Sequence, residues 1–171
     1  MAGDSEGGNL AAAACLLARH AEAWAPVIAH HLRMYPALDA GMDLPCFDLF
    51  GEGHCLSRSA MAYCYEAYLA DPAQRWLKQV SPLRAASLAG LPPASVISCE
   101  YDALRDEAEA HARRLQNDGV PVRALRLLGR VHACIHMPGR SCCTPVAGCG
   151  EYRGAQVPFP DNLQPGPEAF L

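Results

Sequence analysis

The chain has 171 residues, of which 51% are hydrophobic and 19% charged, and its formal net charge is −4. This length is typical of a single domain. The composition excludes a disordered charged tail and favours a chain that buries a hydrophobic core. No basic run points to nucleic acid, and no apolar stretch approaches the ~18 residues of a membrane-spanning helix. The N-terminus has neither the charged start nor the apolar run of a signal peptide, so we expect a cytoplasmic protein.

The first half of the chain predicts a helix, a strand, a loop and a second helix. Residues 5–22 favour a helix, because their centre is rich in Ala and Leu and contains no Pro. An apolar stretch over residues 27–35, bounded by two prolines, predicts a strand. Residues 37–60 are typical of a loop, and the spacing of apolar residues over 59–69 predicts a helix that an Asp-Pro pair ends.

The second half predicts the order strand, helix, strand. Residues 94–101 are short and β-branched, which is typical of a buried strand. Residues 103–118 place apolar side chains on one face, acids first and arginines last, and therefore predict a helix. Residues 120–128 predict a strand. This order indicates a βαβ unit, and hence an α/β fold with a parallel sheet and flanking helices. Residues 138–171 are rich in Pro, Gly and Cys and predict an irregular tail.

Residues 3–7 read Gly-Asp-Ser-Glu-Gly and match G-x-S-x-G, the sharp strand-to-helix turn that exposes a nucleophilic serine. Small residues flank the serine because larger side chains would collide with the strand and the helix. Ser5 is therefore a candidate nucleophile, and the backbone N–H of Glu6 is a candidate donor to an oxyanion. The alternative is an ordinary helix start with Asp4 or Ser5 as N-cap.

Two later residues continue the order of a hydrolase triad. Asp102 follows the strand over 94–101, and His132 follows the next predicted strand. The order serine, acid, histidine is that of α/β-hydrolases, and parallel strands would bring all three to one edge of the sheet. Asp102 would orient His132, which would accept the Ser5 proton and return it to the leaving group. Taken singly, Asp102 would be a helix N-cap and His132 a loop histidine.

Three motifs resemble those of a known family. Residues 3–12 closely resemble the GDSAGGNLAA segment of the hormone-sensitive-lipase-like esterases, the α/β-hydrolase fold-3 family. Residues 100–107 resemble its acid motif, with Asp102 at the catalytic acid, and residues 129–132 are similar to its G-x-x-H motif. The resemblance runs in order over roughly residues 2–137.

The resemblance implies a partial α/β-hydrolase domain over residues 1–137, followed by the tail over 138–171. It implies hydrolysis of small-molecule carboxylic esters by Ser5, Asp102 and His132, without organic cofactor or metal. The oligomeric state is not indicated by the sequence.

The sequence also departs from the family in ways that bear on activity. The family carries H-G-G-G upstream of its serine, where glycine N–H groups build most of the oxyanion hole, and this sequence contains no such motif. Glu6 stands where the family usually has Ala, and Ala133 and Cys134 stand where it tends to have Gly and Phe. We therefore expect the N-terminal strands and the C-terminal helix of the fold to be missing, and the isolated chain to have little or no esterase activity. The alternative function is an inactive fragment with at most an interaction role.

The histidines and cysteines near the end of the domain suggest zinc as a further alternative. Zinc needs three or four converging ligands, and the candidates are His132, Cys134 and His136, with Cys142, Cys143 and Cys149 behind them. The Pro and Gly that follow argue against the helix that an i, i+4 histidine pair requires, so we expect no metal. The nine cysteines include no C-x-x-C pair, and we interpret those before the tail as mostly buried free thiols.

Overall fold

The computed structural model describes residues 1–19, 27–137 and 156–158, so most of the predicted tail and three of its cysteines lie outside the described residues. The helices and strands, in chain order, are β1 (Ala2–Asp4), α1 (Ser5–Ala18), β2 (His31–Met34), α2 (Cys46–Phe50), α3 (Arg58–Tyr68), β3 (Ala94–Tyr101), α4 (Arg105–Asn117), β4 (Val122–Val131) and β5 (Gln156–Pro158). Three short 3-10 turns, at residues 72–76, 82–84 and 134–136, complete the described elements.

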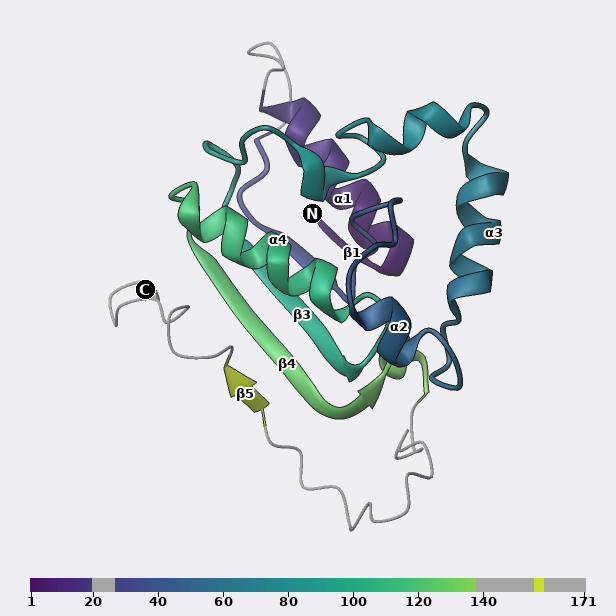
Figure 1. The fold of residues 1–171 in the computed structure, drawn as a ribbon. Helices are drawn as coiled ribbons and strands as arrows, with labels where there is room; N and C mark the ends of the chain where they lie inside the picture. Colours follow the sequence, from purple (N-terminus) through teal and green to yellow (C-terminus); the bar gives the residue numbers. More distant parts are fainter. Residues whose placement is uncertain (20–26, 138–155, 159–171) are drawn as a thin grey trace.

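The strands form one sheet in the order β1-β2-β3-β4-β5, which Figure 1 shows from one side. The first four strands are parallel, and β5 pairs with β4 in the antiparallel sense. Arg33 in β2 is the register partner of Gly3 in β1 and of Val96 in β3. The parallel α/β fold expected from the sequence is therefore confirmed, and the carboxyl ends of β1 to β4 meet at a single edge.

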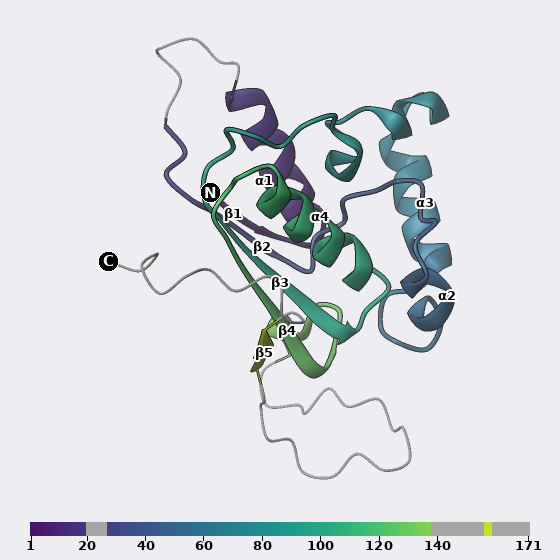
Figure 2. The ribbon, with the colours of Figure 1, turned by 60° about the vertical axis from the view of Figure 1, so that its left-hand side comes forward.

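Helices α1 and α4 pack against the same face of the sheet, as Figures 1 and 2 show from two directions. Their buried sides meet in a core that includes Leu16 of α1, Val96 of β3 and Leu115 of α4. The apolar face predicted for the helix over 103–118 is confirmed, because its members are all buried: Leu104, Ala108, Ala112 and Leu115. Gly119 takes a φ of +78°, a conformation that favours glycine and stops the helix.

The predicted boundaries differ from the observed ones mainly before β3. Strand β2 spans only four residues, all of which have register partners in β3 and three of which have partners in β1. The expected loop over 37–60 contains the short helix α2. Helix α3 begins at Arg58, where the Ser57 hydroxyl accepts a hydrogen bond from the Ala60 N–H at 3.1 Å.

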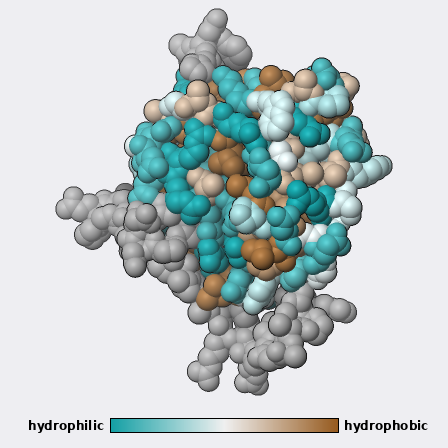
Figure 3. All heavy atoms as spheres, in the orientation of Figure 1, coloured by the Kyte–Doolittle hydropathy of each residue, from teal (hydrophilic) through white to brown (hydrophobic). Residues whose placement is uncertain are grey.

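A second apolar cluster lies where the segment between β2 and β3 folds over the carboxyl end of the sheet (Figure 2). It joins Phe47 of α2, Met61 and Tyr65 of α3, and Leu104 before α4. The face drawn in Figure 3 is largely hydrophilic, with hydrophobic residues gathered in a few small groups. Over the described part of the chain, no helix has the length and apolar character to cross a bilayer.

Candidate active site

Ser5 stands at a sharp turn between β1 and α1, with a backbone φ of +50°. This left-handed conformation is costly for a residue with a side chain, and it turns the serine out of the strand direction. The turn is closed by a near approach of backbone: a Cβ on Gly3 would lie 2.1 Å from the Gly7 carbonyl oxygen. A Cβ on Gly8 would lie 2.7 Å from the Cβ of Pro36, whereas one on Gly7 would meet no described atom within 4 Å. The structure thus requires glycine at positions 3 and 8 rather than at position 7.

Asp102 follows β3 directly and is completely buried. Its Oδ1 accepts a hydrogen bond from the Leu104 N–H at 2.9 Å, just before α4 begins. Its Oδ2 lies 3.0 Å from Nδ1 of His132. The N-cap of α4 is Leu104, so Asp102 is not the helix N-cap that the sequence offered as an alternative. One of its oxygens accepts from the turn before α4, and the other faces the histidine.

A bulge in β4 places His132 against this carboxylate. The register moves from Cys99 opposite Leu127 to Tyr101 opposite Val131, so two extra residues of β4 are accommodated. Gly129 lies in the bulge with a φ of +67°, and its N–H donates to a Glu100 carboxylate oxygen at 2.7 Å. The G-x-x-H motif thus has glycine at position 129 because the turn that leads to the histidine requires a positive φ there.

The His132 ring connects the acid to the serine. Its Nε2 lies 2.9 Å from Ser5 Oγ, so an Nδ1–H that donates to Asp102 leaves Nε2 free to accept from the serine hydroxyl. The Tyr35 ring packs against the imidazole in a T-shaped arrangement, with ring centroids 4.8 Å apart. The structure therefore brings Ser5, His132 and Asp102 together from the ends of three strands, in an arrangement that can move a proton off the serine.

Beside Ser5, a pocket of about 330 Å³ opens between α1 and α3. Its walls are mostly apolar and comprise Ser5, Glu6, Asn9, Leu10, Ala37, Met61, Cys64, Tyr65, Tyr68 and Val80. The Glu6 side chain is exposed, while its backbone belongs to the first turn of α1. Sequence analysis did not identify this pocket, because its lining residues come from segments that lie far apart in the sequence.

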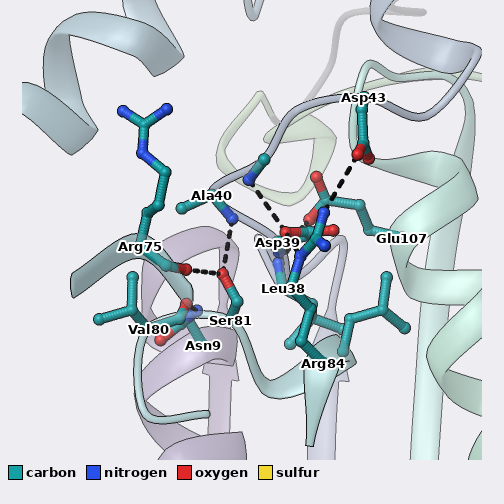
Figure 4. A network of polar contacts seen from close by, with 12 residues as sticks. Asn9, Leu38, Asp39, Ala40, Asp43, Arg75, Val80, Ser81, Arg84 and Glu107 are labelled. Atoms are coloured by element: carbon teal, nitrogen blue, oxygen red, sulfur yellow. Dashed lines mark hydrogen bonds and ion pairs between the residues drawn. The ribbon is translucent and has the colours of Figure 1, made fainter. Parts of the chain in front are cut away.

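Asn9 fixes the start of α1 to the segment that follows β2, as Figure 4 shows. Its side-chain N–H groups donate to the carbonyl oxygens of Ala37, at 2.7 Å, and Val80, at 2.8 Å. The Ala37 N–H in turn donates to the Ser5 carbonyl oxygen at 3.2 Å. This buried side chain therefore holds the serine turn in place, a role that its sequence position alone did not reveal.

Glu107 belongs to the same network (Figure 4) and is a second residue whose role sequence analysis did not identify. The acids at the start of the helix over 103–118 were interpreted only as favourable residues for a helix start, and the structure shows that Glu107 is fully buried. Its Oε2 accepts from the N–H groups of Leu38 and Asp39, and Asp39 also pairs with Arg84 at 2.7 Å. Burial raises the pKa of Glu107 well above its ordinary value, although the two N–H donors oppose that shift.

The histidines and cysteines of the zinc alternative do not converge in the described part of the chain. His136 lies near the serine turn, where its ring N–H donates to the Asp4 carboxylate at 2.8 Å. No group of three potential metal ligands occurs among the described residues, and Cys142, Cys143 and Cys149 lie outside them. Three of the six described cysteines are buried: Cys15, Cys46 and Cys99.

Known proteins share the fold of this chain. The family model described as alpha/beta hydrolase fold matches residues 1–136. The chain belongs to the α/β-hydrolase fold-3 family. An arylesterase of Saccharolobus solfataricus is 35% identical over 144 residues, which are 81% of this chain and 45% of the relative. An ethyl acetate hydrolase of Pseudomonas putida is 33% identical over 136 residues, 79% of this chain and 42% of the relative.

Solved esterase structures share the fold. A thermostable esterase from Pseudomonas putida matches with a TM-score of 0.74 at 38% identity, over 86% of this chain and 44% of its own. Carboxyl esterase 2 of Tuber melanosporum matches with a TM-score of 0.75 at 28% identity, over 82% of this chain and 48% of its own. The chain thus spans less than half the length of these relatives.

Proposed function

We propose that this chain carries the nucleophile, base and acid of a carboxylic-ester hydrolase. The observation that supports the proposal most strongly is the unbroken contact from Ser5 Oγ to His132 Nε2, at 2.9 Å, and from His132 Nδ1 to Asp102, at 3.0 Å. Helix-start and loop-histidine roles would account for each residue alone, but not for their meeting at one point. The names of the esterase relatives favour the same reaction.

The geometry suggests a role for each group. Ser5 attacks the ester carbonyl carbon while His132 takes the hydroxyl proton on Nε2, and the buried Asp102 carboxylate stabilises the imidazolium that forms. His132 then returns the proton to the leaving alcohol. In the second half of the reaction, water deprotonated by His132 attacks the acyl-enzyme and releases the acid.

The developing oxyanion needs N–H donors, and this chain offers the backbone N–H of Glu6, the residue after the nucleophile. In this fold a further donor comes from the H-G-G-G segment, a motif that this sequence does not contain. Loss of one donor costs about 10² to 10³ in rate. We therefore propose that the chain, taken alone, reacts at Ser5 but turns esters over slowly.

The pocket suggests the class of ester. Its volume of about 330 Å³ and its apolar lining beside Ser5 suit a short apolar acyl or alcohol group rather than a charged one. The name of the ethyl acetate hydrolase relative points to the same size of substrate. We propose short-chain, uncharged carboxylic esters as substrates.

A serine-directed fluorophosphonate probe tests the proposal without requiring fast turnover. We expect stoichiometric labelling that maps to Ser5, is abolished by Ser5→Ala, and is unaffected by Ser59→Ala at an exposed position on α3. Hydrolysis of p-nitrophenyl acetate should be slow and lost in the Ser5→Ala variant. A folded wild-type chain, judged by cooperative thermal unfolding, that takes up no probe would favour the inactive alternative.

A further inference from the structure

Two cysteines flank the acid and the histidine of the candidate site. Cys99 lies in β3, three residues before Asp102, and Cys134 begins the 3-10 turn two residues after His132. Their Sγ atoms are 3.7 Å apart, and neither is in a disulfide. A disulfide has an S–S bond of about 2.05 Å, so the two sulfurs need to approach by only about 1.7 Å to bond.

The two thiols differ in access and in acidity. Cys99 is fully buried, whereas Cys134 is partly exposed. The hydrogen bond from Cys99 lowers the pKa of Cys134 to about 7, helped by the positive charge of Arg130 and opposed by burial and by Asp102. The same contact, together with burial, raises the pKa of Cys99. Thiolate character and access determine which cysteine an oxidant attacks, so Cys134 is the reactive member.

We propose that Cys134 and Cys99 are a redox-active pair that closes into an intramolecular disulfide when the protein meets hydrogen peroxide. The Cys134 thiolate attacks one peroxide oxygen, so that an S–O bond forms, the O–O bond breaks, and the departing hydroxide is protonated to water. The Cys99 sulfur then attacks the sulfenic sulfur of Cys134. The S–S bond forms, the S–O bond breaks, and the Cys99 proton leaves with the hydroxide as a second water.

The pair gives up two electrons to the peroxide, and a dithiol reductant reverses the reaction by exchange. The bond would join the end of β3 to the loop after β4, the two elements that carry Asp102 and His132. Between His132 and Cys134 lies only Ala133, whose φ of +58° is already unfavourable for a non-glycine residue. The short link therefore couples the oxidation state of Cys134 to the segment that holds the imidazole.

Peptide mapping tests the proposal directly. The folded chain is treated with one equivalent of hydrogen peroxide, its remaining thiols are alkylated, and the digest is analysed by mass spectrometry. We expect a peptide that links Cys99 to Cys134, two hydrogens lighter than the reduced pair, which dithiothreitol removes. The linkage should persist in Cys64→Ala, which removes an exposed cysteine distant in sequence from the pair.

Single variants of the pair separate the two chemical steps. In Cys99→Ser the hydroxyl can still donate to Cys134 but cannot form a disulfide, so the sulfenic acid at Cys134 should accumulate as a dimedone adduct, whereas in Cys134→Ala the buried Cys99 should stay unmodified. The proposal is overturned if Cys134 stays reduced while Cys64 is oxidised, or if Cys134 links mainly to another cysteine. Because the readout is a mass, it does not depend on ester hydrolysis, and either proposal can fail without the other.

Discussion

The buried cation of β2 leads to a quantitative prediction about acid stability. Arg33 is completely buried, and its guanidinium donates to Nδ1 of His31 at 2.6 Å and to Nδ1 of His111 at 3.0 Å. Burial lowers the pKa of Arg33 to about 10, so it remains charged at neutral pH. Burial, together with the Arg33 charge, lowers the pKa of His31 to about 3 and that of His111 well below its ordinary value. Both rings are therefore neutral acceptors in the folded protein.

The size of the effect follows from proton binding. As the pH falls below 6.5, the unfolded chain protonates its histidines while folded His31 stays neutral, so the folded state binds fewer protons and loses stability. Between pH 7 and pH 5 this loss amounts to about 2 kcal/mol for His31, against the roughly 5–15 kcal/mol that holds a typical domain. His111 acts in the same direction, and the stability returns as the pH rises.

Urea unfolding at pH 7, 6 and 5 measures this loss. In the variant His31→Gln the amide oxygen still accepts from Arg33 but cannot titrate, so the decline between pH 7 and pH 5 should be about 2 kcal/mol smaller than in the wild type. His30→Gln, at the exposed neighbouring position, is the matched control. Wild-type and His31→Gln curves that run parallel with pH would refute the assignment of a neutral His31 beside Arg33.

Three further predictions concern the serine turn, the buried acid and the histidine's partner. Gly3→Ala should lower the free energy of unfolding by about 1–3 kcal/mol, whereas Gly7→Ala, which faces open space, should leave it unchanged or raise it by up to about 1 kcal/mol; equal effects in denaturant titrations would contradict this. The raised pKa of Glu107 makes the folded state bind more protons than the unfolded chain, so stability should fall as pH rises above 4.5. The free energy of unfolding of Glu107→Gln, measured by urea titration, should therefore rise relative to that of the wild type between pH 5 and 8. A difference between the two proteins that does not change with pH would argue against this. Asp102→Asn should slow fluorophosphonate labelling of Ser5 by on the order of 10³ to 10⁴, and an unchanged rate would disprove its positioning role.

The unit from β3 to β4 was predictable from sequence because its signals are local. The β-branched run predicted both ends of β3 correctly. The apolar helix face and the glycine that follows it predicted the ends of α4 to within two residues. The serine turn was predictable for a similar reason, since its close backbone approach requires Gly3. The chain order then placed Asp102 and His132 at the same edge of the sheet.

The remaining features depend on contacts between distant segments. The N–H groups that Glu107 accepts from lie 68 and 69 residues away in the sequence, so nothing near it indicates that this acid is buried. Arg33 and His111 are 78 residues apart in the sequence. A basic residue in a short apolar strand suggests an exposed strand, and only the contact with His111 of α4 shows that Arg33 is covered. The pocket also depends on distant segments, because its walls come from α1 and from the segment between β2 and β3, which includes α3.

The contact between Ser5 and His132 joins residues 127 positions apart, whereas Asp102 and His132 are separated by only 30. Contacts between distant residues are slow to form, because the intervening chain must first be ordered. The acid–histidine pair can thus assemble within a local β3–α4–β4 unit, but the serine joins it only after β1 and β2 have docked. During synthesis Ser5 emerges before His132, so under the proposed function it stays an ordinary, unreactive alcohol until β4 is in place. The time course of probe labelling at Ser5 would then report when the sheet is complete.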